Sequence, residues 1–277
     1  GLAEQGLENV LVVDGHSSDD TRDVAEAHGA RVVVQAGSGK GQAVREALAH
    51  VESDYVLMVD GDGTYRPEDA PTMLEPLLAG EAEHVIGDRF ADMDPNAMSG
   101  LNQVGNRLFN GAFRTIHGGE FDDILSGYRA FTRDSVGQMR LTAEGFGIET
   151  EMAVECARRN IRTKVVPISY LARPAGSETN LRPVKDGGVI LLTIYRMAKT
   201  SNPLFYFGSV ALLCFLVGAA IGTYVGVEWF TAQVSHEVLA VVAAFTILLG
   251  VQLLMFGVLS DLIVTLHHEQ MRRFDED

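Results

Sequence analysis

Residues 55–62 read YVLMVDGD, an apolar run that ends in two aspartates separated by one glycine. A continuous apolar run of this length, bounded by turn residues, is typical of a strand buried on both faces of a parallel sheet. Similar runs at 8–14, 31–35 and 84–87 alternate with helical patterns at 18–28, 41–51 and 68–79. This alternation predicts an α/β domain with a doubly wound, parallel sheet.

Two of the predicted strands end in a carboxylate, Asp14 and Asp60. Ligands of doubly wound sheets bind at the carboxyl ends of the strands, so both side chains are candidate ligand contacts. The pair Asp60 and Asp62 suits a hard divalent cation, Mg²⁺ or Mn²⁺, that keeps positions open for phosphate oxygens. The pattern predicts a metal site that stabilises a departing diphosphate.

The glycine-rich and acidic segments do not match two other ion- or phosphate-binding motifs. A calcium-binding EF-hand needs Gly at the sixth and Glu at the twelfth loop position, where this chain has Tyr65 and Pro71. A phosphate-binding loop at 37–41 lacks both its first glycine and the hydroxyl after Lys40. An ordinary acidic turn at Asp60 and Asp62 stays open as an alternative.

The chain is strongly acidic, with 37 acids against 22 bases and a formal net charge of −15. Nucleic-acid binding is therefore not expected, because phosphate neutralisation needs a basic face. Such a charge is expected of a protein that works in high salt, where screening removes its self-repulsion, although an ordinary acidic protein is the alternative. Cys156 and Cys214 lie in very different segments, which fits a reducing compartment.

Two uncharged segments, at about 204–227 and 238–260, are each long enough to cross a bilayer. Their short link has no Lys or Arg, whereas bases precede the first segment and follow the second. The positive-inside rule then predicts a multi-pass membrane protein with both termini and the catalytic domain in the cytosol. We expect residues 187–202 to form a helix in the membrane interface, or simply the last helix of the domain.

The motifs occur in a defined order along the chain: VVDGHSSDDT (12–21), GSGKGQAVREAL (37–48), VDGDGTYRPED (59–69), GDRF (87–90), SGYRAF (126–131), GFGIETEM (145–152) and YLARPAGSETNL (170–181). This series resembles the family 2 glycosyltransferases of GT-A fold, the nucleotide-diphospho-sugar transferase fold. More narrowly, it is similar to polyprenyl- and dolichyl-phosphate hexose synthases, especially the archaeal dolichyl-phosphate glucosyltransferases that begin N-glycosylation. The resemblance covers nearly the whole chain, including the two C-terminal segments.

The resemblance assigns donor-site residues position by position. Asp60 and Asp62 match the metal-binding D-x-D, and Asp14 matches an aspartate that contacts the nucleotide. Lys40 matches the lysine of the G-K-G motif near the nucleotide sugar. Arg173 and Ser177 match the segment that closes on the diphosphate. Two positions depart from the pattern. Gly15 stands where the family usually has a second aspartate. Glu178 stands where the family often has a lysine, so Arg182 or Lys185 would have to supply that positive charge.

An acceptor phosphate needs arginine, which can hold it through two hydrogen bonds at once. The candidates are Arg89, Arg107 and Arg129, and the resemblance adds Ser126 with Gly127. The predicted catalytic set is Asp60, Asp62, Arg89 and Arg129. Each has an alternative: Lys40 as a solvated loop lysine, Arg89 and Arg129 paired with nearby acids, and Glu149 and Glu151 as ordinary helix-surface acids.

The expected function is transfer of a hexose, from UDP-glucose, to dolichyl or polyprenyl phosphate at the cytosolic membrane face. GDP-mannose as donor, a non-lipid glycan as acceptor and an inactive membrane-bound scaffold are the alternatives. We expect a catalytic domain at 1–186, the interfacial helix at 187–202, and two transmembrane helices with a cytosolic tail at 203–277. The family's first strand is expected to be missing before residue 8.

Overall fold

The computed structural model describes residues 1–119, 121–174 and 183–275. Within them the chain divides into two compact units, Gly1–Ile194 and Tyr195–Asp277. The first unit holds all the strands among these residues, and the second consists of long helices.

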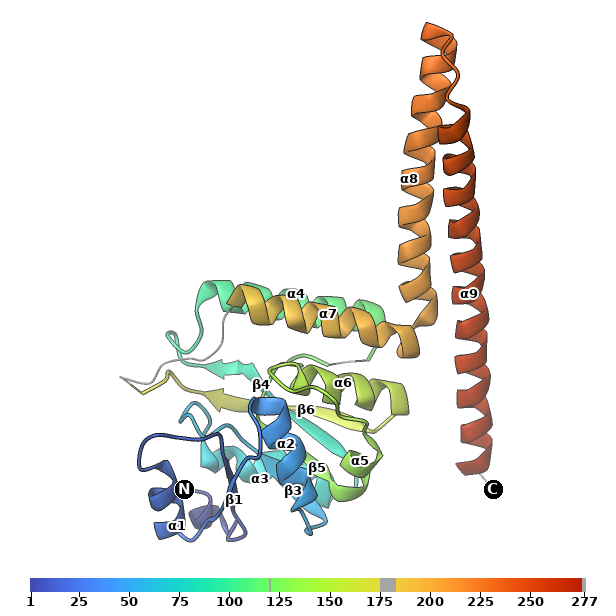
Figure 1. Cartoon of the computed structure of the whole chain (residues 1–277). Helices are drawn as coiled ribbons and strands as arrows, with labels where there is room; N and C mark the ends of the chain where they lie inside the picture. The colour runs from blue at the N-terminus through green and yellow to red at the C-terminus, as the bar shows by residue number, and fades with distance from the viewer. Residues whose placement is uncertain (120, 175–182, 276–277) are drawn as a thin grey trace. The chain divides into compact units, whose positions relative to one another are not determined.

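The strands of the first unit form two sheets (Figure 1). One sheet pairs β1 (Leu11–Asp14) with β2 (Arg31–Val34) in parallel. The other has the order β3-β5-β4-β6, with β3 at Tyr55–Met58, β4 at His84–Met93, β5 at Arg129–Thr132 and β6 at Thr163–Tyr170. The predicted strands at the start of the chain are therefore present, and the α/β fold is confirmed.

The direction of β5 differs from the all-parallel prediction, because it runs antiparallel to both β3 and β4. The loop before Arg129 places Gly127 against the carboxylate of Asp60. Asp60 comes directly after the carboxyl end of β3, so β5 begins at this end of β3. A strand that starts at this edge can only run back through the sheet. The antiparallel strand therefore follows from the loop that precedes it.

Helices connect and cover the strands of the first unit. They are α1 (Thr21–Ala27), α2 (Lys40–Ala49), α3 (Ala70–Leu78), α4 (Gly100–His117), α5 (Arg133–Gln138), α6 (Ile148–Arg159) and α7 (Pro183–Ser201), with 3₁₀ turns at Ala3–Gln5 and Pro67–Asp69. Ser99 caps α4 by accepting a hydrogen bond from the backbone of Asn102. α7 extends past the unit boundary at Ile194, and it begins before the predicted interfacial helix.

The core of the first unit lies between α3 and the larger sheet. Met73 of α3, Val85 of β4 and Ala130 of β5 are fully buried there. The Tyr65 ring packs against Tyr128 and Tyr170, each with ring centroids 5.3 Å away. The loop after Asp62 is thereby fastened to the sheet through its aromatic side chain.

A wide cavity separates the two sheets. Among the described residues, β1 pairs only with β2 and β3 pairs only with β5, so each keeps one edge without a strand partner. The cavity measures about 2100 Å³, and apolar side chains of β1, β3 and α2 line it, including Val12, Leu57 and Val44. It extends to Asp14 and Asp60 at the carboxyl ends of the two strands.

The second unit is a helical hairpin of α8 (Pro203–Ala232) and α9 (Glu237–Asp275). Pro203–Ala232 and the stretch Glu237–Leu266 of α9 are long and apolar enough to cross a membrane, with mean hydropathy 2.3 and 2.5. The helix after the second apolar segment continues to Asp275, where the sequence led us to expect only a tail.

Small residues let α8 and α9 approach closely. A Cβ atom on Gly218 would lie 2.6 Å from Ile247 Cγ1 and 3.1 Å from the Ala243 carbonyl oxygen. A Cβ on Gly226, in the same helix, would meet nothing within 4 Å. Close approach through small residues is a common way for helices to associate inside a bilayer.

We expect Gly218→Leu to destabilise the α8–α9 hairpin by about 1–3 kcal/mol, because overpacking forces the helices apart. Gly226→Leu is the matched control and should have no such effect. The measurement is the SDS concentration at which the purified protein loses half of its helical circular-dichroism signal. Equal midpoints for the two variants would contradict close packing at Gly218.

Candidate active site

The candidate site lies where the carboxyl ends of β1 and β3 and the middle of β4 face the cavity. Of the residues predicted from the sequence, the cavity is lined by Asp14, Lys40, Asp60, Asp62, Arg89 and Arg173. Arg107, Ser126 and Arg129 are not among the described residues that line it. Ser177, Glu178 and Arg182 lie outside the described residues, as does the side chain of Lys185.

Both aspartates of the D-x-D segment are paired with a cation from another part of the chain. The Lys40 Nζ lies 2.7 Å from Asp60 Oδ1 and 2.8 Å from Asp60 Oδ2. Arg173 Nη2 donates to Asp62 Oδ2 at 2.6 Å, while the backbone and hydroxyl of Thr64 donate to Asp62 Oδ1. The carboxylates therefore face positive charge, as they would face a metal ion.

The donor set of Asp60 and Asp62 fits a divalent cation of the Mg²⁺ or Mn²⁺ type. Such ions take oxygen ligands and commonly use only one or two protein carboxylates, completing their shell with water and substrate phosphate. The described residues contain no group of three or more His, Cys, Asp and Glu side chains that could hold a metal. Any ion held here would therefore complete its shell with water or with oxygens that come with the ligand.

Lys40 starts α2 and lies between two carboxylates. Besides Asp60 it contacts Oε1 of Glu149, which lies in the first turn of α6 and is 3% exposed. Burial alone would lower the pKa of Lys40, but the charges of Glu149 and Asp60 outweigh it and raise this pKa above its ordinary value. Lys40 is therefore a fully charged site residue and not a solvated loop lysine.

Glu149 and Glu151 are both buried, so the alternative that they are ordinary surface acids is wrong. Glu151 accepts hydrogen bonds from the Thr142 backbone, the Thr142 hydroxyl and the Ala143 backbone at 2.7–2.8 Å. It therefore anchors a loop, whereas Glu149 points to Lys40. Sequence reasoning missed this difference, because the two residues share one helix and one chemistry.

The loop before β5 forms a wall of the site. A Cβ atom on Gly127 would lie 2.4 Å from Asp60 Oδ2, so any side chain at this position would displace the carboxylate. The Gly127 backbone donates to the Tyr65 hydroxyl at 3.0 Å. Ser126, which we predicted to contact the acceptor, is fully buried within this loop.

Arg129 holds the same loop from behind. Its guanidinium donates to the carbonyl oxygens of Ser126 at 3.0 Å and Ile124 at 2.7 Å. It also donates to Nε2 of His84 at 3.1 Å, and burial lowers the pKa of His84 well below its ordinary value, which keeps this imidazole neutral. Arg129 has no exposed surface, so the predicted contact with an acceptor phosphate does not fit its position.

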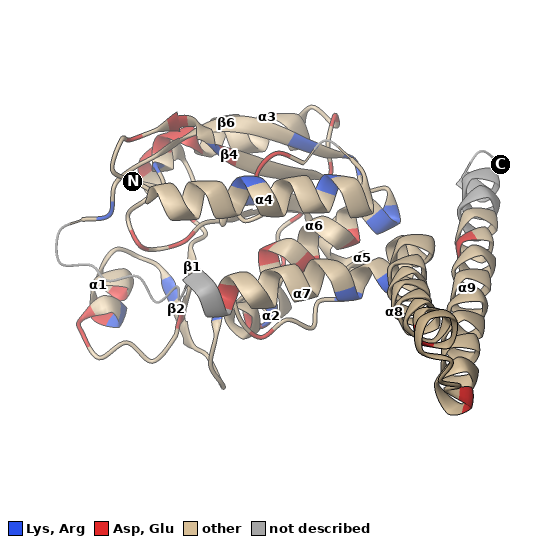
Figure 2. Ribbon diagram, turned by 90° about the horizontal axis from the view of Figure 1, so that it is seen from above, with Lys and Arg blue, Asp and Glu red and all other residues tan. Residues whose placement is uncertain are grey.

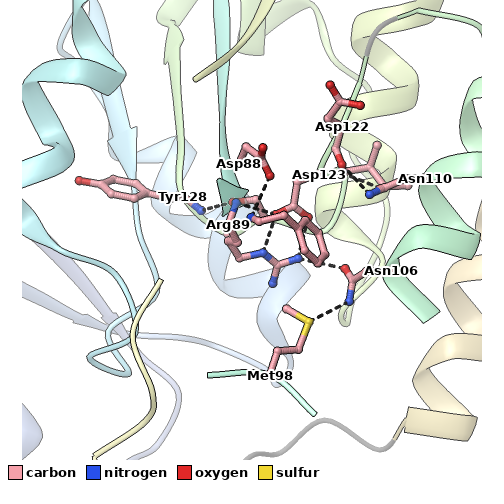
Figure 3. Close-up of polar contacts among 12 residues, drawn as sticks. Asp88, Arg89, Met98, Asn106, Asn110, Asp122, Asp123 and Tyr128 are labelled. Carbon is pink, nitrogen blue, oxygen red and sulfur yellow. Dashed lines mark hydrogen bonds and ion pairs between the residues drawn. The ribbon is translucent and has the colours of Figure 1, made fainter. Parts of the chain in front are cut away.

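Arg89 does reach the cavity, at the end of a buried polar network (Figure 3). Its Nε and Nη2 donate to the two Asp123 oxygens at 2.7 Å each, and Nη2 also donates to Asn106 of α4 at 3.0 Å. Burial opposes its charge, but Asp123 raises the pKa of Arg89 well above the ordinary value. Its Nη1 has no hydrogen-bond partner among the described residues, and Asp123 is a second site residue that sequence reasoning missed.

Asp14 lines the cavity at the end of β1. Hydrogen bonds from Ser17 lower the pKa of Asp14 below its ordinary value, and Arg22 lies 3.6 Å away. The carboxylate is therefore ionised at neutral pH. Only 3% of the Asp14 surface is exposed. Arg107, by contrast, is exposed on α4 and does not line the cavity.

The chain is similar to known glycosyltransferases over most of its length. The family model described as Glycosyl transferase family 2 matches residues 2–139. Glycosyltransferase AglJ of Haloferax volcanii is 62% identical over 274 residues, which cover 99% of this chain and 90% of that protein. The dolichyl-phosphate hexose transferase of the same organism is 32% identical over 192 residues, covering 69% of this chain and 82% of that protein.

Among solved structures, glucosyl-3-phosphoglycerate synthase from Mycobacterium tuberculosis has a similar fold. Its complex with phosphoglyceric acid gives a TM-score of 0.56 at 23% identity, covering 69% of each chain. Its complex with Mn²⁺, uridine diphosphate and phosphoglyceric acid gives 0.54 at 25% identity, covering 70% of this chain and 69% of that one. With these similarities and this arrangement of motifs, the chain belongs to glycosyl transferase family 2 and is a glycosyltransferase of GT-A-like fold.

Proposed function

We propose that this glycosyltransferase moves glucose from UDP-glucose to the phosphate of dolichol or another polyprenol at a membrane surface. The observation that carries the proposal is the pairing of Asp60 with Lys40 and of Asp62 with Arg173 in one cavity with Arg89. The name of the 32% identical relative, a dolichyl-phosphate hexose transferase, supports the acceptor. The uridine diphosphate bound by the mycobacterial synthase supports the donor.

On the donor side, Asp60 and Asp62 would hold a divalent cation, whose chemistry is to stabilise the charge that develops on the departing diphosphate. Lys40 and Arg173 lie beside these carboxylates and would bind the same diphosphate oxygens as they become more negative. Charges placed in advance where the transition state needs them are usually the largest catalytic contribution. Asp14 would contact the nucleotide, at the cavity end formed by β1.

On the acceptor side, the attacking atom is a phosphate oxygen. The second pKa of a phosphate monoester is about 6, so this oxygen is already ionised at neutral pH and needs no dedicated base. Arg89 would hold the phosphate through Nη1, while Asp123 and Asn106 fix the rest of its guanidinium. Attack forms the new bond to the anomeric carbon as the bond to the diphosphate breaks, and its electron pair leaves with UDP.

The surface of the first unit carries exposed apolar side chains that suit a lipid acceptor. On α4, Leu101, Val104 and Leu108 are 62–70% exposed and share one helical face. α4 contains Arg107 and Arg114 but no acid, and it lies side by side with α7 in one layer (Figures 1 and 2). We propose that α4 and the α7 segment 187–194 rest on the membrane, with arginines near the lipid phosphates.

The two apolar helices of the second unit would anchor the protein in the same membrane. Their connecting segment lacks Lys and Arg, so by the positive-inside rule it would lie outside, with both chain termini in the cytosol. The proposed division remains a catalytic domain at 1–186, an interfacial helix at 187–202 and the membrane part at 203–277.

Transfer is tested with membranes that carry the protein, radiolabelled UDP-glucose, polyprenyl phosphate and Mn²⁺ at high salt. We expect label in the lipid fraction, no transfer after chelation, and a loss of about a hundredfold or more in Asp62→Ala. GDP-mannose and a water-soluble phosphate acceptor form the parallel arms. Label that never enters lipid from UDP-glucose would overturn the proposal, and undiminished activity of Asp62→Ala would overturn the metal assignment.

Gly127→Ala tests the wall beside Asp60. The added methyl would displace the Asp60 carboxylate, so we expect transfer to fall about a hundredfold, as small displacements of catalytic groups can cause. The control is Gly145→Ala, where a Cβ meets nothing within 4 Å. Transfer rates and thermal melting are measured for both, and equal rates would argue against this close contact.

The membrane face of α4 is tested with Val104→Glu combined with Leu108→Glu, two exposed positions that do not line the cavity. Charges on this face would oppose lipid contact, so we expect the KM for polyprenyl phosphate in vesicles to rise on the order of tenfold. The KM for a short, water-soluble acceptor should stay constant. Val24→Glu, a similar change at an exposed position of α1, is the control, and a rise in both KM values for the α4 variant would point to damage of the site instead.

A further inference from the structure

Lys40 contacts both Asp60 and Glu149, and Asp60 is also a proposed metal ligand. The ammonium group lies 2.7 Å from Asp60 Oδ1 and also contacts Glu149 Oε1. The Glu149 side chain is 4% exposed, and among the described residues Lys40 is its ion-pair partner. A cation therefore already rests on one of the two carboxylates that would hold a metal.

The position of Glu149 next to Lys40 is built into the backbone. Cβ atoms on Gly39 and Gly41 would lie 2.3 Å from the Glu144 carbonyl oxygen and 2.2 Å from that of Ala143. The two glycines thus let the loop before α6 pack directly on the start of α2, and the Gly41 backbone donates to Glu144 at 3.0 Å. This contact brings the first turn of α6 to the Lys40 side chain.

Glu149 lies at the N-terminal end of α6, beside Lys40. It is the second residue of α6, where free backbone N–H groups and the helix dipole favour negative charge. Its neighbour Glu151 is already occupied by the backbone of Thr142 and Ala143. Glu149 is therefore the acid of this helix that is available to the ammonium group of Lys40.

A divalent cation at Asp60 would compete with Lys40 for the same carboxylate oxygens. If Asp60 were the only anionic partner of Lys40, metal binding would leave an unpaired ammonium in a partly buried site, which is costly. With Glu149 in contact, Lys40 can give up Asp60 and keep one partner.

We propose that Glu149 is a positioning residue that retains Lys40 when a divalent cation occupies Asp60. Lys40 then stays beside the metal as a second positive charge for the diphosphate of the sugar donor. The inference rests on the metal site of the proposed function, and it concerns how this chain's own residues admit the ion.

The test is Mn²⁺ binding to the full-length, detergent-solubilised protein by calorimetry, without nucleotide or lipid. We expect Glu149→Gln to weaken Mn²⁺ binding about tenfold, since one charge-assisted contact of Lys40 is lost. Glu144→Gln removes an equal charge from an exposed side chain of the same loop and should change the affinity little. Thermal melting shows whether each variant is folded.

A double-mutant cycle with Lys40→Gln separates retention of Lys40 from a direct effect on the metal. Lys40→Gln alone should tighten Mn²⁺ binding, because the competing cation is gone. In that background Glu149→Gln should have an effect under about threefold, because Glu149 has no ammonium left to hold. Glu149→Asp should restore part of the wild-type affinity.

Three results would overturn the proposal: equal weakening by Glu149→Gln with and without Lys40, no weakening in either background, or no Mn²⁺ binding by the wild-type protein. The first would make Glu149 a direct contributor to the ion's field. Transfer of label to lipid is measured separately, so a failure of the proposed lipid acceptor leaves this test intact.

Discussion

Charge balance at the end of β3 is the constraint on which the rest of the site depends. Asp60 and Asp62 are separated by one residue, so their carboxylates repel each other unless cations are close. Lys40 comes from the start of α2 and Arg173 from the segment after β6, and each neutralises one of them. The fold must therefore bring three segments that are far apart in sequence to one point, and the loops around the cavity are arranged for that purpose.

Glycines make this convergence possible by allowing backbone to approach where a side chain would collide. Gly127 lies against the Asp60 carboxylate, and Gly39 and Gly41 lie against the carbonyl oxygens of Ala143 and Glu144. Arg129 then holds the Gly127 loop by its carbonyl oxygens, and Glu151 holds the loop before α6 by its backbone N–H groups. The glycines of the G-K-G and S-G-Y motifs are therefore explained by the close packing of these loops.

The sequence predicted what depends on local pattern. The apolar runs at 31–35 and 55–59 became β2 and β3, and the order of strands and helices placed Asp14 and Asp60 at one cavity. Contacts between distant segments could not be predicted in this way. The pairing of Arg89 with Asp123, the burial of Arg129 and the direction of β5 all depend on how the 121–128 loop folds back onto the site, and no periodicity encodes that path.

The charges around the cavity explain why a diphosphate would need more than this chain's own side chains. Among the described residues, the ion pairs at the site contain the cations Arg22, Lys40, Arg89 and Arg173 against the carboxylates Asp14, Asp60, Asp62, Asp123 and Glu149. The buried guanidinium of Arg129 behind the Gly127 loop adds a fifth positive charge, so five positive charges balance five negative ones and the site has no net charge to attract a nucleotide diphosphate. A divalent cation at Asp60 and Asp62 would make the site cationic, and its effect would be strongest where burial limits screening. Arg89 needs a fixed partner because its guanidinium is buried. An unpaired cation would be costly at a position with so little exposure. Because Asp123 neutralises most of the charge of Arg89, this guanidinium can still donate a directed hydrogen bond to the acceptor phosphate.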